Sequence, residues 1–362
     1  MDLFSPVTLG DLQLPNRVVM APLTRMRAEA DGTPNELIAQ HYAQRASTGL
    51  IVTEGTYPSA ESRAYAGQPG IVTDAHVDGW RRVAEAVHAR GGRLFMQVMH
   101  GGRVSHTAIT GTDRIVAPSA IAIQGEAHLP DGSKAPYPVP HALSTAEVRS
   151  VVDEFVAAAR RAVAAGLDGV EVHSANGYLL HEFLAPGSNR RDDEYGGSPE
   201  NRARLSIEVA TAVAEAIGAG RVGIRTSPAH NIQDAWEQDP ADVEDTYQAL
   251  VEGLRPLGLA YLSVLHPDPA GDLVQGLRKR FEGHLMANSG FGVVTTRQDA
   301  VDLIADGVAD SVAVGRMVIA NPDLVERWAG GHPENEPNPA TFYAPGATGY
   351  TDYPFLDGRT TA

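Results

Sequence analysis

The sequence predicts a (β/α)8 barrel, because short apolar runs alternate with longer amphipathic segments from one end of the chain to the other. Each of the eight runs is too short for a helix and is rich in Val, Ile and Leu, as buried parallel strands are. Eight strands in strict alternation with helices favour a closed barrel over an open sheet. A chain of 362 residues is long enough for one barrel, so we expect a single domain over residues 1–362.

The individual elements follow from these runs and from helical spacing. The expected strands are residues 17–21, 50–53, 94–99, 169–173, 222–226, 260–264, 285–287 and 311–314. Helices are expected at residues 34–47, 76–89, 144–165, 199–217, 241–254 and 296–305. The clearest helix starts at Ser144, where Ser144 and Glu147 form a capping-box pattern and apolar residues then recur at three- and four-residue steps.

Two segments do not fit the alternation of strands and helices. Residues from about 105 to 141 form a long, proline-rich connection with alternation around residues 121–124, which predicts an inserted lobe with a hairpin between strands three and four. The tail from about 330 to 362 is rich in Pro, Gly and Tyr. Its aromatic residues, among them Tyr343 and Tyr350, favour a segment docked on the barrel.

Composition excludes several kinds of chemistry. The sequence has no cysteine, which removes disulfides, thiolate metal sites and a Cys nucleophile. Its formal net charge of −16, without a basic tract, argues against nucleic acid or an anionic membrane as a partner. The two lysines, Lys134 and Lys279, do not follow strand-like runs, so Schiff-base chemistry lacks a lysine. With no signal-peptide pattern and no run of 18 apolar residues, we expect a cytoplasmic protein.

Two motifs resemble binding sites only in their letters. Residues 218–223 match the dinucleotide glycine pattern, but they close a helix and open a strand, whereas that fingerprint follows a strand and opens a helix. His173, His181 and Glu182 could be drawn as a metal cluster, but histidines near strand ends are more often neutral, hydrogen-bonded residues. No metal is expected.

Polar and small residues gather where the expected strands end, which is where barrels place their chemistry. Ser289, Gly290, Gly315 and Arg316 follow the last two strands, and small residues with an arginine suit a phosphate. Gln97 and Arg225 could hold a planar polar heterocycle deeper in the mouth. Taken singly, each has an ordinary structural explanation, such as an ion pair or a tight turn. As a set they favour a phosphate-bearing ligand.

Residues 173–181 form the most specific segment. His173 and Asn176 are spaced like two residues at the start of a helical turn, so both side chains would point the same way. Two neutral donors that converge on one point suit an oxygen that gains charge during a reaction. Tyr178 is a phenol that is protonated at neutral pH and can donate a proton, although it could also simply pack at the rim.

Ordered motifs along nearly the whole chain resemble the old yellow enzymes, which are FMN-dependent ene-reductases, and their classical branch in particular. The matching segments are residues 15–25, 49–55, 100–103, 173–184, 188–198, 200–202, 314–316, 320–322 and 349–354. The resemblance implies a flavoprotein that takes electrons from NADPH or NADH and reduces activated C=C bonds of α,β-unsaturated carbonyl or nitro compounds.

The resemblance also implies roles for residues. Thr24 would bond the flavin O4, and Gln97 and Arg225 would hold its pyrimidine edge. Tyr178 would protonate the substrate Cα, while His173 and Asn176 bind its carbonyl or nitro oxygen. The expected FMN-binding set is Pro22, Leu23, Thr24, Gly55, Gln97, Arg225, Ser289, Gly290, Gly315 and Arg316. The expected substrate-binding set is Tyr65, Met99, His173, Asn176 and Tyr343, with the two tyrosines as aromatic walls.

Three departures from the family pattern stand out. Met99 occupies a place where many members carry Trp, which predicts a wider pocket, and residues 265–269 replace a more polar loop. Residues 287–291 are a variant phosphate loop. The alternative to an ene-reductase is a flavin-binding barrel for storage or sensing, against which the set His173, Asn176 and Tyr178 weighs. A metal-dependent hydrolase lacks a carboxylate–histidine set. The chain is expected to be a monomer or homodimer.

Overall fold

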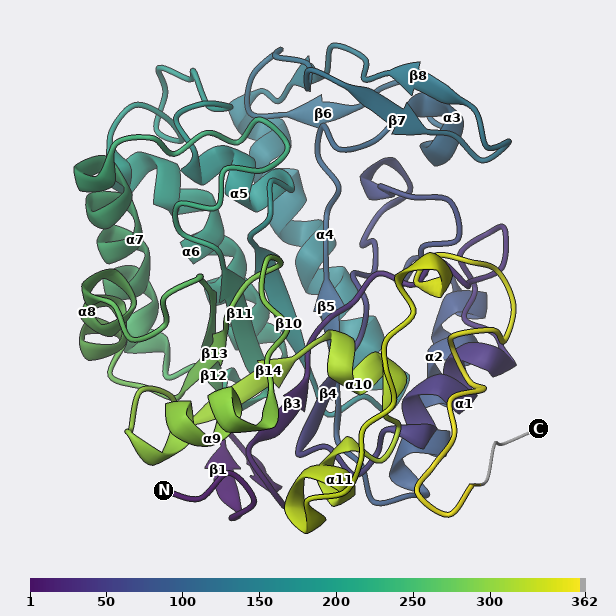
Figure 1. The fold of residues 1–362 in the computed structure, drawn as a ribbon. Helices are drawn as coiled ribbons and strands as arrows, with labels where there is room; N and C mark the ends of the chain where they lie inside the picture. Colours follow the sequence, from purple (N-terminus) through teal and green to yellow (C-terminus); the bar gives the residue numbers. More distant parts are fainter. Residues whose placement is uncertain (359–362) are drawn as a thin grey trace.

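The computed structural model describes residues 1–358, in which eight parallel strands close into a barrel (Figure 1). The strands are β3 (Val18–Met20), β4 (Leu50–Val52), β5 (Leu94–Val98), β10 (Gly169–Ser174), β11 (Val222–Thr226), β12 (Tyr261–Leu265), β13 (Leu285–Asn288) and β14 (Ser311–Val314). Each lies at an expected position, and β14 pairs with β3 to close the barrel. The predicted (β/α)8 fold is therefore confirmed.

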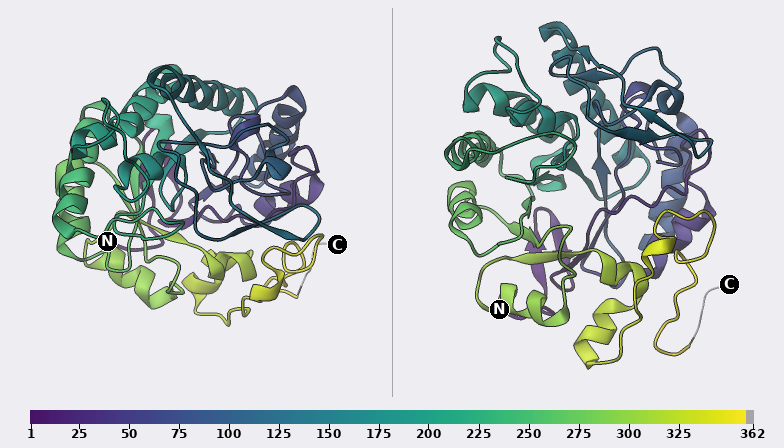
Figure 2. Two further views of the ribbon diagram at one scale, coloured as in Figure 1. Left: turned by 90° about the horizontal axis from the view of Figure 1, so that it is seen from above. Right: turned by 45° about the horizontal axis from the view of Figure 1, so that its top comes forward.

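Helices surround this barrel, and the view from above shows them as a ring around the strands (Figure 2). They are α1 (Glu36–Gln44), α2 (Asp74–His88), α4 (Thr145–Ala164), α6 (Pro199–Ile217), α7 (Pro240–Leu254), α8 (Asp272–Phe281) and α9 (Arg297–Ala305). The capping box of α4 is confirmed, since the Ser144 side chain accepts from the N–H of Glu147 and the Glu147 carboxylate from the N–H of Ser144. Sequence analysis missed α8, whose buried stripe is only Val274, Leu277 and Phe281.

The lower end of the barrel is sealed by the N-terminal hairpin, β1 (Val7–Leu9) and β2 (Leu12–Leu14). Leu9 and Leu14 pack with Phe95 and Tyr261 in one buried cluster. The N–H of Asp11 donates to the carbonyl of Gly220 at 3.1 Å, which places residues 218–223 at this end. This end is remote from the carboxyl ends of the strands, where α/β barrels bind their ligands.

The insertion forms a lobe above the carboxyl ends of the strands (Figure 1). It contains α3 (Thr107–Thr110), the parallel pair β6 (Val116–Ala117) and β9 (His141–Ala142), and the hairpin of β7 (Glu126–His128) and β8 (Lys134–Pro136). The hairpin expected around residues 121–124 was placed too early, because the Asp131–Gly132 turn sets the pairing instead.

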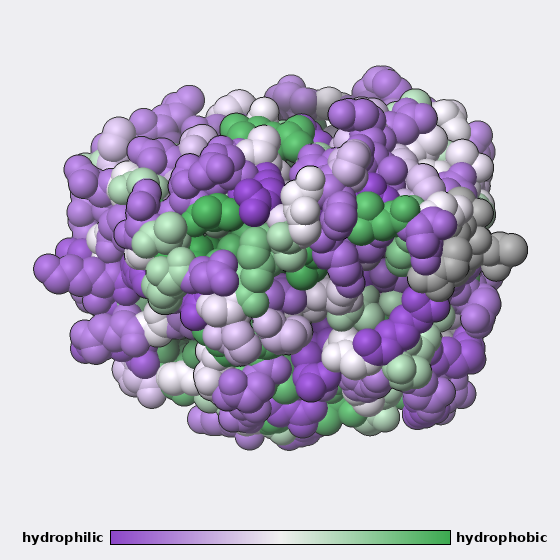
Figure 3. Space-filling model, turned by 60° about the horizontal axis from the view of Figure 1, so that its bottom comes forward, coloured by the Kyte–Doolittle hydropathy of each residue, from purple (hydrophilic) through white to green (hydrophobic). Residues whose placement is uncertain are grey.

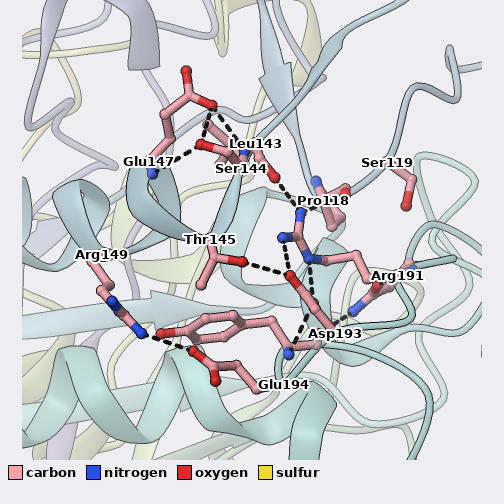
Figure 4. A network of polar contacts seen from close by, with 12 residues as sticks. Pro118, Ser119, Leu143, Ser144, Thr145, Glu147, Arg149, Arg191, Asp193 and Glu194 are labelled. Atoms are coloured by element: carbon pink, nitrogen blue, oxygen red, sulfur yellow. Dashed lines mark hydrogen bonds and ion pairs between the residues drawn. The ribbon is translucent and has the colours of Figure 1, made fainter.

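One arginine ties the lobe to the barrel (Figure 4). Arg191 donates to the carbonyls of Pro118 and Leu143, which directly follow β6 and β9, and its guanidinium also pairs with Asp193. Its side chain is 8% exposed. The β6 and β9 side of the lobe is thus fixed to the segment that follows α5 (Leu179–Leu184).

The C-terminal segment crosses the outside of the barrel beside α1 (Figure 1). It includes α10 (Arg316–Ala320), α11 (Leu324–Gly330) and the short 3-10 helix η4 (Pro339–Thr341) within otherwise irregular chain. Tyr350 is fully buried and stacks on His41 at 3.9 Å, and Arg25 and Arg27 donate to backbone carbonyls between residues 341 and 349. Residues 359–362 of the expected docked tail lie outside the described residues.

The lower face of the molecule is largely hydrophilic, with apolar residues gathered near its middle (Figure 3). Among residues 1–358, no helix has both the length and the apolar character needed to span a bilayer.

Candidate functional site

The register of the barrel strands brings together residues that are far apart in the sequence. His173 on β10 pairs with Arg225 on β11, and Arg225 pairs with Ser263 on β12. All three are buried, and Arg225 donates to the Ser263 hydroxyl at 3.1 Å. His173 and Arg225 therefore lie side by side near the carboxyl ends of their strands, as expected of the flavin and substrate residues.

The predicted helical relation between His173 and Asn176 is wrong. β10 continues through Ser174, and Asn176 and Gly177 have φ of +59° and +80°, which an α-helix does not contain. The helix α5 begins only at Leu179. His173 thus extends from a strand, whereas Asn176 lies in a left-handed turn. The backbone N–H of Asn176 donates to the Ser227 hydroxyl at 2.8 Å.

The side chains of His173 and Asn176 are both neutral. Burial, with smaller effects from Arg225 and His181, lowers the pKa of His173 well below its usual value. His230 Nδ1 lies 3.2 Å from Asn176 Oδ1, and burial lowers the pKa of His230 to about 4. Neutral His230 can donate to this oxygen, which leaves the amide nitrogen of Asn176 for another acceptor.

Tyr178 lies beside His173, with 5.3 Å between the ring centres. Its hydroxyl is 2.8 Å from the hydroxyl of Tyr65. Burial, and to a smaller extent the phenols of Tyr65 and Tyr343, raises the pKa of Tyr178 well above its usual value, so the phenol keeps its proton at neutral pH. Tyr343 itself is 64% exposed, on the C-terminal segment.

Met99 belongs to the same corner of the molecule. It is 2% exposed and packs in one apolar cluster with Ala64 and Tyr178. A Cβ at Gly55 would fall 2.6 Å from the Met99 sulfur, so glycine at 55 leaves room for this side chain. Gly55, Met99 and Tyr178 therefore lie close together in the structure. The sequence predicted a different role for each: FMN binding for Gly55, substrate binding for Met99 and proton donation for Tyr178.

The last two strands present the expected phosphate residues on adjacent loops. Gly290 has φ of +88° and donates its N–H to the Asn288 side chain. Gly315 precedes α10, and Arg316 at the start of that helix donates to the carbonyl of Phe291. Ser289 is half-buried in the same loop as Gly290. Arg316 thus bridges the two loops.

The carboxylate of Glu54 fixes the segment that follows β3. The Glu54 carboxylate accepts the N–H groups of Arg25 and Met26 at 2.9 and 3.2 Å, which fixes the backbone that follows Thr24. Pro22, Leu23 and Thr24 are half-buried. A Cβ at Gly315 would lie 3.4 Å from Leu23, so the first and last strands of the barrel meet at the expected phosphate loop.

These residues fit the flavin that the resemblance implies. Within residues 1–358, Arg225 Nε and His173 Nδ1 are buried and have no hydrogen-bond partner. Buried polar atoms in native structures usually have a hydrogen-bond partner, so both nitrogens indicate a polar ligand at this place. The described residues contain no cluster of three or more His, Asp or Glu side chains placed to hold a metal ion.

Sequence analysis missed four polar residues of the site: Glu171, Ser263, Tyr261 and His230. A signal was available for three of them. Glu171, Tyr261 and Ser263 interrupt apolar strands at alternate positions, the positions that face the barrel interior. His230 belongs to an irregular loop and had no comparable signal.

A sequence model of the NADH:flavin oxidoreductase / NADH oxidase family matches residues 2–335. The chain is 44% identical to a probable flavin mononucleotide-dependent alkene reductase of Leishmania infantum, over 98% of this chain and 97% of that protein. It is 39% identical to 12-oxophytodienoate reductase 7 of Oryza sativa subsp. japonica, over 98% and 94%. Morphinone reductase in complex with tetrahydroNAD is 46% identical, with a TM-score of 0.92 over 99% of this chain and 98% of that one.

Proposed function

We propose a mechanism for this chain, which belongs to the NADH:flavin oxidoreductase / NADH oxidase family and acts as an FMN-dependent ene-reductase. The resemblance to old yellow enzymes is thereby confirmed. The relatives are named as reductases, so a barrel that only stores or senses flavin is not favoured. The observation that carries the proposal is the pair of buried nitrogens on His173 and Arg225 that have no hydrogen-bond partner among residues 1–358, beside the Tyr178 phenol.

The residues that would hold FMN lie at or after the carboxyl ends of the strands. Gln97 and Arg225 would hold its pyrimidine edge, Thr24 its O4, and the backbone of Pro22, Leu23 and Gly55 its ring. Ser289, Gly290, Gly315 and Arg316 would hold its phosphate, because glycines let backbone N–H groups approach and arginine forms charge-assisted bonds with phosphate. When bound, FMN would supply the hydride chemistry that links NADH or NADPH to the β-carbon of the substrate.

The chain's own side chains supply the remaining chemistry. The neutral His173 and Asn176 donate to the carbonyl or nitro oxygen of the substrate, which gains negative charge as the C=C bond is reduced. Tyr178 then gives its proton to the α-carbon, and its hydrogen bond to Tyr65 orients the phenol. Tyr65, Met99 and Tyr343 line the substrate's place, and substrates are small enones or nitroalkenes.

The test is a pair of anaerobic half-reactions. Purified protein should be yellow with one FMN per chain; NADH or NADPH should bleach it, and 2-cyclohexenone should restore the colour. Flavin-free protein, or bleached protein that no enone reoxidises, contradicts the proposal. The comparison of NADH with NADPH identifies the electron donor. The cytoplasmic location and the monomeric or homodimeric state stay predictions.

A further inference from the structure

Glu171 is a buried carboxylate that none of the proposed steps uses. It lies on β10, two residues before His173, and is 0% exposed. Because side chains alternate along a strand, both residues face the same side of the barrel wall, with Glu171 one level deeper. A buried carboxylate is costly unless hydrogen bonds and a nearby positive charge compensate it. Its partners therefore indicate what it does.

Three neighbouring strands contribute to its surroundings. Gln97 on β5 is the register partner of Glu171 and donates to one carboxylate oxygen at 2.8 Å. Tyr261 on β12 donates to the other oxygen at 3.0 Å. The intervening strand carries Gly223 at this level, where a Cβ would fall 2.2 Å from the Tyr261 ring. Glycine at 223 thus lets Tyr261 reach across β11 to Glu171.

Burial raises the pKa of Glu171, and the charge of Arg225 and the hydrogen bonds from Gln97 and Tyr261 oppose this shift. The geometry favours the ionised carboxylate, because both of its oxygens accept and neither donates. The nearby cation is Arg225, two residues beyond Gly223 on β11. Burial lowers the pKa of Arg225, and the charge of Glu171 is the largest influence that opposes this shift. Two of the groups that interact with Glu171, Gln97 and Arg225, are residues proposed to hold FMN.

We propose that Glu171 is a positioning residue for FMN, which fixes the orientation of the Gln97 amide and offsets the charge of Arg225, and thereby sets the reduction potential of the bound flavin. The inference rests on the proposed function, since it assumes that Gln97 and Arg225 hold the pyrimidine edge. A carboxylate only accepts, so the Gln97 amide cannot turn over without placing its carbonyl against Glu171. The end of the amide that faces the ligand is thereby determined.

The direction of the electrostatic effect follows from the charges. Without the Glu171 charge, Arg225 would be an uncompensated buried cation. FMN gains negative charge on reduction, so a less compensated Arg225 would favour reduced over oxidised FMN. Neutralising Glu171 should therefore raise the midpoint potential of FMN, and loss of the fixed Gln97 amide should weaken the binding of oxidised FMN.

The experiment compares the holoenzyme of Glu171→Gln with wild type and with Glu182→Gln. Glu182 is also 0% exposed, but it accepts the N–H of Arg103 and does not contact Gln97 or Arg225 by a hydrogen bond among residues 1–358. Glu171→Gln should shift the balance toward reduced FMN about tenfold, or about 30 mV for a two-electron couple. It should also raise the dissociation constant of oxidised FMN about fivefold or more. Glu182→Gln should change neither quantity.

A second variant covers failure of Glu171→Gln to fold. Glu171→Asp keeps the charge but is one methylene shorter, so it should weaken FMN binding about fivefold or more and leave the midpoint potential near that of wild type. Wild-type potential and FMN affinity in Glu171→Gln, or wild-type affinity in Glu171→Asp, would overturn the inference. Wild-type protein that binds no FMN would instead reject the proposed function, so the two failures are distinguishable.

Discussion

At the scale of single residues, removing the Tyr178 hydroxyl should affect the two half-reactions differently. These are reduction of the flavin by nicotinamide and its reoxidation by the enone. Tyr178→Phe should leave reduction of the flavin by nicotinamide unchanged, since that step needs no proton donor. Reoxidation by 2-cyclohexenone should slow by about 10²–10⁴-fold, the usual contribution of a positioned general acid. Nitroalkenes should suffer less, because their reduced form is a stable anion. Stopped-flow measurement of each half-reaction is the check.

The control for this prediction is Tyr65→Phe. It keeps the Tyr178 phenol and removes only its 2.8 Å hydroxyl partner, so the oxidative half-reaction should slow less than in Tyr178→Phe. Equal slowing of both half-reactions in Tyr178→Phe would show that the phenol is not the proton donor.

Met99 is the second residue with a specific consequence. Its side chain packs against Gly55 and belongs to the apolar cluster that contains Tyr178, and methionine is more adaptable than the tryptophan common in the family. Met99→Trp should lower kcat/KM for bulky β-substituted enones by one to two decades more than for 2-cyclohexenone. This discrimination is about 1.4–2.8 kcal/mol, a reasonable steric effect.

Met99→Leu is the matched control, because it nearly conserves volume and should keep the wild-type order of substrates. If Met99→Trp changes neither the order of substrates nor the stereochemistry of the products, Met99 does not shape the pocket.

At the scale of elements, Arg191 is one of the side chains that anchor the lobe. Arg191 contacts the backbone at Pro118 and Leu143 and lowers the pKa of Asp193 to about 2 (Figure 4). Arg191→Met keeps the stem but removes these charge-assisted bonds, which should cost the lobe about 2 kcal/mol. Amide hydrogen exchange over residues 115–143 should then accelerate roughly 30-fold, while β10 and β11 stay protected.

Arg149→Met is the control for the lobe. Arg149 pairs with Glu194 in the same network, but its side chain is 67% exposed, and exposed pairs contribute little. Unchanged lobe exchange in Arg191→Met would mean that other contacts fix the lobe.

Elements also show what sequence could and could not predict. The barrel strands were predictable because buried parallel strands are continuous apolar runs. The turn at Asn176 was not, because a left-handed backbone at a non-glycine residue is imposed by its surroundings, here the Ser227 hydroxyl. Helix α8 was missed because its apolar stripe is short. The inward position of Glu171 could be read from the strand pattern, but its pairing with Gln97 could not, because register between strands is not visible in the sequence.

At the scale of the whole molecule, buried titratable groups make stability depend on pH from two sides. Burial lowers the pKa of His100 to about 3 and of His284 to about 4, so the unfolded state binds protons first as pH falls below about 6.5. The stability that these histidines contribute is therefore lost as the pH falls from about 6.5 toward their folded-state pKa values. Burial raises the pKa of Glu154 to about 7 and of Glu182 to about 8. The unfolded state loses these protons first, so stability is also lost as pH rises above about 4.5.

The two slopes oppose each other between about pH 4.5 and 6.5, and only the carboxylate slope continues above that range. The free energy of unfolding should therefore fall from pH 6.5 to pH 8, as measured by urea unfolding at constant excess FMN. Glu182→Gln removes one of the groups responsible and should flatten this decline, because an amide has no proton to lose. A wild-type protein that is as stable at pH 8 as at pH 6.5 would show that Glu182 is already ionised in the folded state. In that case Arg103, whose N–H bonds Glu182, compensates the buried charge more strongly than burial opposes it.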